Sequence, residues 1–242
     1  MRFESSPLSA KDIVVNLIPG AIALALFLWF LDGFVGMLIN LLTLGSGIVP
    51  LVIWLVAAYA AGVALNLYRG FVNGEKYERA DADVAARLIL DGDSNLSSPF
   101  KTGLKARAQA IFGEAASGPE LFGLCYRYAA QRGAASRAEA LRANAELFRG
   151  MLSAAWVGIF VSGLVALKHF VLLLLPQFGV VLAVTSFVDY EVVHLALGVI
   201  LFIVCVAATR ALSSQAESCR KAAISEVYTS FYSLTSSNTG TK

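Results

Sequence analysis

Four long stretches of this chain carry no charged side chain, and their length constrains the fold more than any other feature. The hydrocarbon core of a bilayer is about 30 Å thick, so a helix rising 1.5 Å per residue needs roughly 20 apolar residues to cross it. We therefore predict an all-α, polytopic membrane protein with four transmembrane helices. The windows of suitable length are residues 13–31, 48–68, 150–167 and 192–209.

The composition excludes several classes of protein. Of the 242 residues, 57% are hydrophobic and only 15% are charged, whereas a soluble domain carries about 25% charge. A net charge of +2 is too small for a protein that binds nucleic acid through a basic face. The three cysteines are odd in number and imply no disulfide framework. We expect neither a soluble enzyme nor a disordered chain, and no nucleic acid as a partner.

The positions of the basic residues predict the orientation. Of the 19 Lys and Arg residues, 2 precede residue 13, 12 lie from Arg69 to Arg149, and 4 follow from Arg210 onward. Four spans place all of these except Lys168 on one side, as the positive-inside rule requires of the cytoplasmic side. We expect an integral protein of the bacterial inner (plasma) membrane with both termini in the cytoplasm.

The apolar residues 170–187 are long enough to be a fifth span. Five spans would place the C-terminal tail on the opposite side from the basic central block, so we prefer four. Pro176, Gln177 and Gly179 interrupt the stretch, which favours an interfacial or re-entrant segment on the outer face. A shorter apolar stretch, residues 33–47, lies at the corresponding place in the first half of the chain.

These predictions divide the chain into four parts. Long helices over residues 137–167 and 192–231 should leave the membrane and extend into a cytoplasmic helical domain, because no helix breaker interrupts them. Ser136 and Glu139 have the spacing of a capping box, and Ser98-Pro99 is typical of a turn. The parts are an N-terminal transmembrane hairpin at 1–68, the cytoplasmic helical domain at 69–149, a C-terminal transmembrane hairpin at 150–210, and a cytoplasmic helix with a disordered tail at 211–242.

Apolar side chains repeat at helical spacing along the predicted cytoplasmic helices. They exceed what one short central block can cover, so we expect the chain to form a homo-oligomer partly through them. The stripes are Leu104, Ala108, Ile111 and Phe112; Leu121, Phe122, Cys125 and Ala129; and Leu212, Ala216, Cys219, Ala223 and Val227.

Polar or helix-bending residues occur inside the first two spans. Pro19 cannot donate a hydrogen bond to the carbonyl of Val15, so a kink is expected beside Asn16 and Gly20. Asn66 lies at a similar depth in the second span and could bond to Asn16. We interpret Asn16, Pro19, Gly20 and Asn66 as hinge or packing residues; the alternative is ion coordination by freed carbonyl groups.

Charged residues near the outer ends of the spans form a second group. Asp32, Asp189 and Glu191 are acidic, and Lys168 is the one basic residue predicted there. In a symmetric ring of chains this excess of acid would concentrate cations at an outer pore mouth. The simpler alternative is that these residues end their helices in water.

Catalytic and metal-binding patterns are weak. Ser162-Gly163 and His194 are similar to the serine and histidine of rhomboid proteases, although Phe160 stands where that family has glycine. A membrane-helix serine usually bonds to its own backbone instead. Glu191 and His194 have the E-x-x-H spacing of di-iron sites, without the second copy such a site needs. We expect no cofactor and no metal.

Three functions remain as hypotheses. The first is a homo-oligomeric assembly, a pore or channel-like effector regulated through its cytoplasmic helices. The second is a membrane anchor or scaffold for a soluble cytoplasmic protein, and the third is an intramembrane hydrolase. In outline, the predicted architecture resembles small multi-pass proteins that accompany bacterial defence systems, some of which permeabilise membranes. The predicted spans hold no Asp, Glu, Lys or Arg, which disfavours a proton-coupled transporter.

Overall fold

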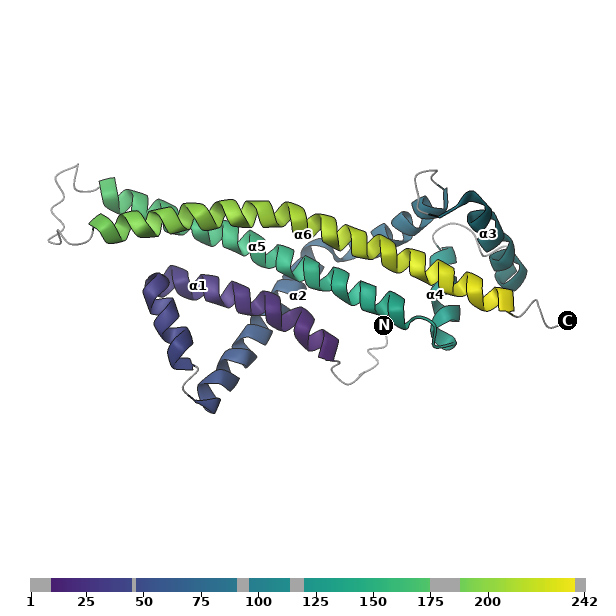
Figure 1. The fold of residues 1–242 in the computed structure, drawn as a ribbon, viewed down its shortest axis with the longest axis horizontal. Helices are drawn as coiled ribbons and strands as arrows, with labels where there is room; N and C mark the ends of the chain where they lie inside the picture. The colour runs from purple at the N-terminus through teal and green to yellow at the C-terminus, as the bar shows by residue number, and fades with distance from the viewer. Residues whose placement is uncertain (1–9, 45–46, 91–95, 114–119, 175–187, 238–242) are drawn as a thin grey trace. The chain divides into compact units, whose positions relative to one another are not determined.

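The computed structural model describes residues 10–44, 47–90, 96–113, 120–174 and 188–237. Within these residues every regular element is an α-helix (Figure 1), so the predicted all-α class is confirmed. The helices are α1 (Ala10–Leu44), α2 (Ile48–Leu90), α3 (Ser98–Phe112), α4 (Glu120–Gln131), α5 (Ser136–Leu174) and α6 (Val188–Ser237).

Four helices, α1, α2, α5 and α6, are long and apolar enough to cross a membrane. The chain is therefore an integral membrane protein with four candidate spans. The apolar windows of α1 and α2 are Ile13–Phe30 and Pro50–Leu67, which match the first two predicted spans. The predicted long helices are also confirmed, since α5 and α6 each run without interruption through a span and far beyond it.

Helices α1 and α5 also extend beyond the C-terminal ends of the spans predicted for them. Helix α1 continues past residue 31 to Leu44, so most of the apolar stretch 33–47 is helical and continuous with the first span. Figure 1 shows the ribbon of α1 bending along its length. Helix α5 continues through Lys168 to Leu174. The rest of the predicted outer segment, including Pro176, Gln177 and Gly179, lies outside the described residues.

The chain divides into two compact units. The membrane unit comprises Met1–Arg69 and Leu147–Ser214, and the second unit comprises Gly70–Glu146 and Gln215–Lys242. In the membrane unit, Trp29 of α1 is buried against Val161 and Val165 of α5. Small residues bring its helices together: a Cβ on Gly158 of α5 would lie 2.6 Å from the sulfur of Cys205 of α6. This is the close backbone approach that small residues allow in membrane bundles.

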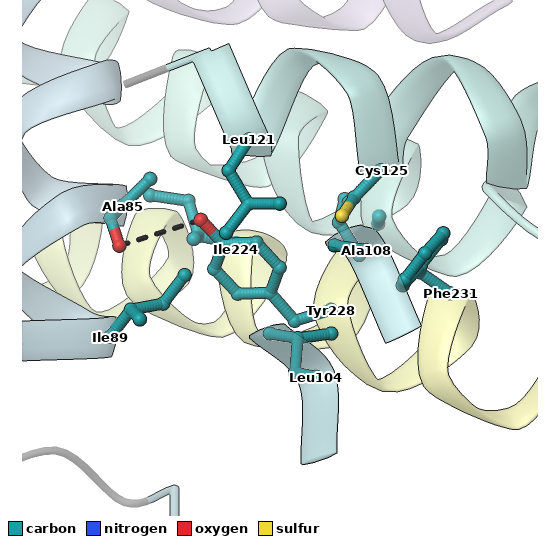
Figure 2. Close-up of a cluster of buried hydrophobic side chains, with 11 residues drawn as sticks. Ala85, Ile89, Leu104, Ala108, Leu121, Cys125, Ile224, Tyr228 and Phe231 are labelled. Carbon is teal, nitrogen blue, oxygen red and sulfur yellow. Dashed lines mark hydrogen bonds between the residues drawn. The ribbon is translucent and has the colours of Figure 1, made fainter. Parts of the chain in front are cut away.

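The second unit has a core to which α2, α3, α4, α5 and α6 all contribute. Tyr228 and Phe231 of α6 are fully buried at its centre, and the Tyr228 hydroxyl donates a hydrogen bond to the Ala85 carbonyl of α2 (Figure 2). Each buried aromatic side chain removes a large apolar area from water, which makes these two the main anchors of the unit. The buried cluster is Ala85, Ile89, Leu104, Ala108, Leu121, Cys125, Ala138, Ile224, Val227, Tyr228 and Phe231.

This core covers most of the predicted apolar stripes within the chain. Val227 is only 2% exposed, so the end of the α6 stripe packs inside the second unit. Ile111 is an exception, because it is 44% exposed and faces away from the core. Helix α2 supplies a further wall of this core with Ala85 and Ile89. The predicted stripes did not include these two residues, so the sequence did not reveal this packing.

Two local predictions at helix ends were wrong. Ser98-Pro99 opens helix α3, where proline is tolerated in the first turn and the Ser97 hydroxyl accepts a hydrogen bond from the Phe100 N–H at 3.4 Å. At the start of α5, Ser136 already lies inside the helix, and the Glu139 N–H donates to the Ala135 carbonyl at 2.9 Å. The Glu139 carboxylate accepts instead from the Tyr126 hydroxyl at 3.3 Å.

Candidate functional site

The two histidines of the chain meet in the membrane unit. His169 lies in α5 and His194 in α6, and their rings stack with centroids 5.0 Å apart and planes 23° apart. These are the only histidines in the sequence. A buried pair of imidazoles in membrane helices is costly to retain and is a functional-site hypothesis by default. We therefore take the histidine cluster, defined as His169, Tyr190, Glu191 and His194, as the candidate site.

Helix geometry brings these side chains together. Glu191 and His194 are three residues apart on α6 and so lie on one face of the helix. One turn further along α6, Gly198 has no side chain, and a Cβ there would lie 3.2 Å from the Cβ of Ala166. This close approach holds α6 against α5, and His169 lies three residues beyond Ala166 on the same helix. The packing of α5 against α6 thus places all three polar groups at one helix crossing.

Glu191 contacts His169, and the two form an ion pair when the His169 ring is protonated. The Glu191 Oε2 atom contacts His169 Nδ1, and the two side chains are only 14% and 7% exposed. Glu191 is the fourth residue of α6, so its carboxylate lies near the positive end of the helix dipole. Because each charge would be expensive alone in a low-dielectric environment, the pair compensates both. The carboxylate also fixes which nitrogen of His169 carries a proton, namely Nδ1.

His194 has aromatic neighbours and an unpaired nitrogen. Its residue is 3% exposed, and its Nδ1 atom is buried without a hydrogen-bond partner among the described residues. The Tyr190 ring packs on it with centroids 4.2 Å apart. A buried polar atom without a partner carries its full desolvation cost. His194 is therefore held by ring contacts rather than by hydrogen bonds at Nδ1.

The chemistry that this cluster supports is proton exchange. Imidazole titrates near neutral pH, and a carboxylate beside one ring stabilises a single positive charge. Among the residues that the structure describes, no group of three or more His, Cys, Asp or Glu side chains could hold a metal ion. Glu191 and His194, which have the E-x-x-H spacing, both contact His169 instead.

Ser162 and His194 are not joined by a hydrogen bond in the described part of the chain. The Ser162 hydroxyl donates to the Gly158 carbonyl at 2.6 Å, with Ile159 as a second acceptor at 3.3 Å. Ser162 is fully buried. The Ser162 hydroxyl is thus hydrogen-bonded within its own helix, which is the usual state of a serine in a membrane helix.

The polar residues of the first two spans form a helix contact. The Asn66 side-chain N–H donates to Asn16 Oδ1 at 2.6 Å. Gly20 and Gly62 permit this approach, because a Cβ on Gly20 would overlap the Ala58 carbonyl oxygen and one on Gly62 would overlap that of Asn16. Pro19 is fully buried inside α1, and its ring would lie 2.8 Å from a Cβ on Gly150 of α5. The predicted packing residues thus join α1, α2 and α5.

The residues predicted for an outer mouth have different environments. Glu191 is largely buried in its pair with His169, while Lys168 is exposed. The side chains of Asp32 and Asp189 lie outside the described part of the structure. Glu191 therefore does not simply end a helix in water, and the acidic excess available to a pore mouth is smaller than the sequence implied.

His169 is the functional residue that the sequence analysis did not place. It directly follows Lys168, just past the end of the third predicted span. The signal available was its partner, since Glu191 and His194 share one face of α6 and must pack against some residue of the preceding helix. Identifying that residue requires the rotation of α5, which the apolar pattern of a helix buried on several sides does not give.

A groove between α1 and α6 is the other notable feature of the membrane unit. Its volume is about 410 Å³. All of its lining side chains are apolar, so it offers no polar path for ions or solutes. They are Ile22, Ala25, Leu26, Trp29, Leu197, Ile200, Leu201 and Val204.

Comparisons with protein-family models, with curated proteins and with solved structures give no match for this chain.

Proposed function

We propose that this protein acts as a homo-oligomeric membrane assembly, a channel-like effector whose membrane unit is regulated through the second unit. In this proposal the protein resides in the bacterial inner membrane. The second unit and both termini lie in the cytoplasm, where a soluble protein partner can act on the second unit. Ions are the proposed permeating species, with transport between copies of the chain rather than through one chain.

The observation that carries this proposal is the sharing of helices between the two units. Helices α2, α5 and α6 each contribute residues to both units. On α6, Cys205 packs in the membrane unit and Tyr228 is buried in the core of the second unit. A continuous helix that contributes to two packed cores offers a means of coupling their states.

The orientation has support from the core of the second unit. Ala85 and Leu104 precede the third span, whereas Tyr228 and Phe231 follow the fourth, and all four share one buried cluster. Residues that pack together must lie on the same side of a membrane. The chain must therefore cross an even number of times between residues 104 and 224, as the four-span arrangement requires. The positive-inside rule then favours the cytoplasm for that side.

The apolar groove supports a conducting path between several chains rather than through one chain. The described cavity in the membrane unit has only apolar walls, and water and ions are not stable there. A conducting path would therefore form between copies. Because Val227 is buried within its own chain, we place the contacts between copies on the membrane helices. On α2, Ile53 and Val56 are both 63% exposed and are suited to contact lipid or another copy.

The assembly can be tested directly. Native mass measurement in mild detergent should give a particle with several chains. Ion flux should be measured with the protein reconstituted into liposomes, and an oligomer that passes ions supports the proposal. Replacing Asp32 and Asp189 with Asn should lower any preference for cations, most clearly at low ionic strength, where screening is weak. A monomeric particle, or the absence of flux at any pH and membrane potential tested, would contradict the effector function.

A membrane anchor or scaffold is the second candidate. The observation favouring it is the hydrophobic core of the second unit, which would let that unit serve as a docking body for a soluble protein. The two candidates differ in ion flux, and they also differ in the effect of a second-unit defect. Replacing Tyr228 with Ala should alter ion flux in the effector, whereas in an anchor it should alter only partner binding.

A further inference from the structure

The histidine cluster has room for one balanced positive charge but not for two. When His169 is protonated, its positive charge is compensated by the Glu191 carboxylate, which contacts Nδ1 of the ring. His194 lies on the other face of that ring, with centroids 5.0 Å apart. A second proton would place two cationic rings in contact, with one carboxylate to compensate them. Two interacting sites of this kind take up protons in separate steps that belong to the pair.

The charged groups around His194 also make a second protonation harder than the first. From α5, Lys168 and His169 act on His194, and from α6 Glu191 does so. Tyr190, also from α6, is an aromatic neighbour. From α1, the side chains that join the apolar cluster with α5 and α6 are Leu26, Trp29 and Phe30. The side chains of Asp32 and Asp189 lie outside the described part. Glu191 is thus the carboxylate that the described residues supply.

The geometry confines any separation of α5 and α6 to the end of the helix pair that carries the histidine cluster. Beyond His169, α5 continues for five residues to Leu174, and before Glu191, α6 has only three residues. On the other side of the cluster, the Gly198–Ala166 and Gly158–Cys205 contacts lock the two helices together. Repulsion at the cluster would therefore separate the helix ends and leave the deeper contacts in place.

The cluster also faces a defined side of the membrane. Arg149 and His169 are 20 residues apart on α5, which corresponds to about 30 Å, one hydrocarbon thickness. Because Arg149 belongs to the basic side, the cluster lies near the opposite face. From its position it would respond to the pH of the compartment on that face.

From these observations we infer that His169, Glu191 and His194 form a proton-binding site whose second protonation separates the adjoining ends of α5 and α6. At neutral pH the stacked rings and the His169–Glu191 pair hold the ends together. In acid, His194 becomes charged and the ring contact breaks. This inference goes beyond the proposed function, because it holds for a conducting assembly and for an anchor alike.

Proton uptake by each of the two histidine rings can be measured by NMR. The chain contains two histidines, so full-length protein labelled with [¹⁵N]histidine, carrying a histidine-free tag, gives signals from only two rings. In lipid nanodiscs titrated from about pH 8 to about pH 4.5, we expect two separate protonation steps. His194→Phe, which keeps an aromatic ring, should leave one step. If neither ring is protonated over this range, the inference is wrong.

The separation of the helix ends needs its own measurement. Val171 of α5 and Val193 of α6 are both exposed and can be replaced with Cys for spin labelling, with Cys219 changed to Ser. The distance between the labels should lengthen on acidification in the otherwise native protein. In His194→Phe it should stay short at both pH values. An unchanged distance in a doubly protonated protein, or the same lengthening in His194→Phe, would overturn the switch.

Two charge variants complete the test. Glu191→Gln removes the compensating carboxylate, so the first protonation step should move to lower pH. Lys168→Gln is the matched control, since Lys168 is exposed and its charge is screened by water. It should shift the steps much less than Glu191→Gln does. Equal shifts in the two variants would mean that Glu191 has no special role. None of these readouts depends on ion flux, so they separate this inference from the proposed function.

Discussion

The Tyr228 hydroxyl donates a hydrogen bond to the backbone carbonyl of Ala85 at 3.4 Å, across 143 residues of chain. Ala85 follows the second span and Tyr228 follows the fourth. Arg107 reinforces the link by donating to the Tyr232 carbonyl at 2.7 Å, with its guanidinium 3.9 Å from the centre of the Tyr232 ring. Arginine is well suited to satisfying carbonyls near a helix C-terminus in this way. These contacts join the central block to the last helix.

Membrane topology is the first property that this link predicts. Reporter fusions after Gly74 and Ser237 should give the same signal, because the two segments belong to one folded unit. In the proposed orientation that signal is cytoplasmic. Fusions after Leu44 and Phe187 should give the opposite signal. Opposite signals at Gly74 and Ser237 would establish an odd number of spans between them, in conflict with the shared core.

Tyr228 should be a major source of stability in the second unit. Tyr228→Ala leaves a cavity in a fully buried site and should lower the free energy of unfolding by about 3–5 kcal/mol. Tyr228→Phe keeps the ring and should cost about 1 kcal/mol or less. Chemical unfolding followed by circular dichroism measures both. Ile111→Ala, at an exposed site, is the control and should change stability little; equal losses in all three would show that Tyr228 is no special anchor.

Cys125 reports on the integrity of this core. Burial raises the pKa of its thiol from 9.0 to about 12, and the thiolate is the reactive form. At about pH 8 a maleimide should therefore react with Cys219, which is partly exposed, long before it reacts with Cys125. Mass spectrometry of the labelled peptides distinguishes the two sites. Rapid labelling of Cys125 in the folded protein would contradict the packing of α4.

The same thiol makes stability depend on alkaline pH. Below pH 9 the thiol is protonated in both states and contributes nothing. Between pH 9 and about pH 12 the unfolded chain loses the proton and the folded one keeps it, so the free energy of unfolding falls by up to about 1.4 kcal/mol per pH unit. Cys125→Ala should remove this part of the alkaline slope. An unchanged slope in that variant would assign it to other groups.

The glycine contact between α1 and α2 should not tolerate a methyl group. Gly20→Ala and Gly62→Ala would each place a Cβ on a backbone carbonyl oxygen of the other helix, so the helices must separate and the Asn16–Asn66 bond should be lost. Overpacking of this kind costs about 1–3 kcal/mol. Thermal stability by size-exclusion chromatography after heating is the measurement. Gly163→Ala is the matched control, because its Cβ would lie 3.9 Å from the nearest atoms, on the Phe202 ring, and it should melt like the parent protein.

The sequence by itself determined the membrane class, the four spans and the long unbroken helices. Each of these depends on local properties, namely the length of charge-free windows and the absence of helix breakers, which can be read without knowing what packs against what. The same is true of the apolar stripes on α3, α4 and α6, whose periodicity is a property of one helix. Ser98-Pro99 was misread because the same pair suits a turn and the first turn of a helix equally well.

Only the tertiary structure decided which partners those helices meet. The periodicity of the stripe ending at Val227 predicted a contact with another copy of the chain, whereas Ala85 and Ile89 of α2 share the buried cluster with Val227 within one chain. His169 joined the candidate site because α5 is rotated so that its ring faces Glu191 and His194. Contacts between residues 22 to 143 positions apart depend on helix rotation, axial shift and close approach at glycine. A one-dimensional pattern constrains these only weakly, because many rotations bury the same apolar area.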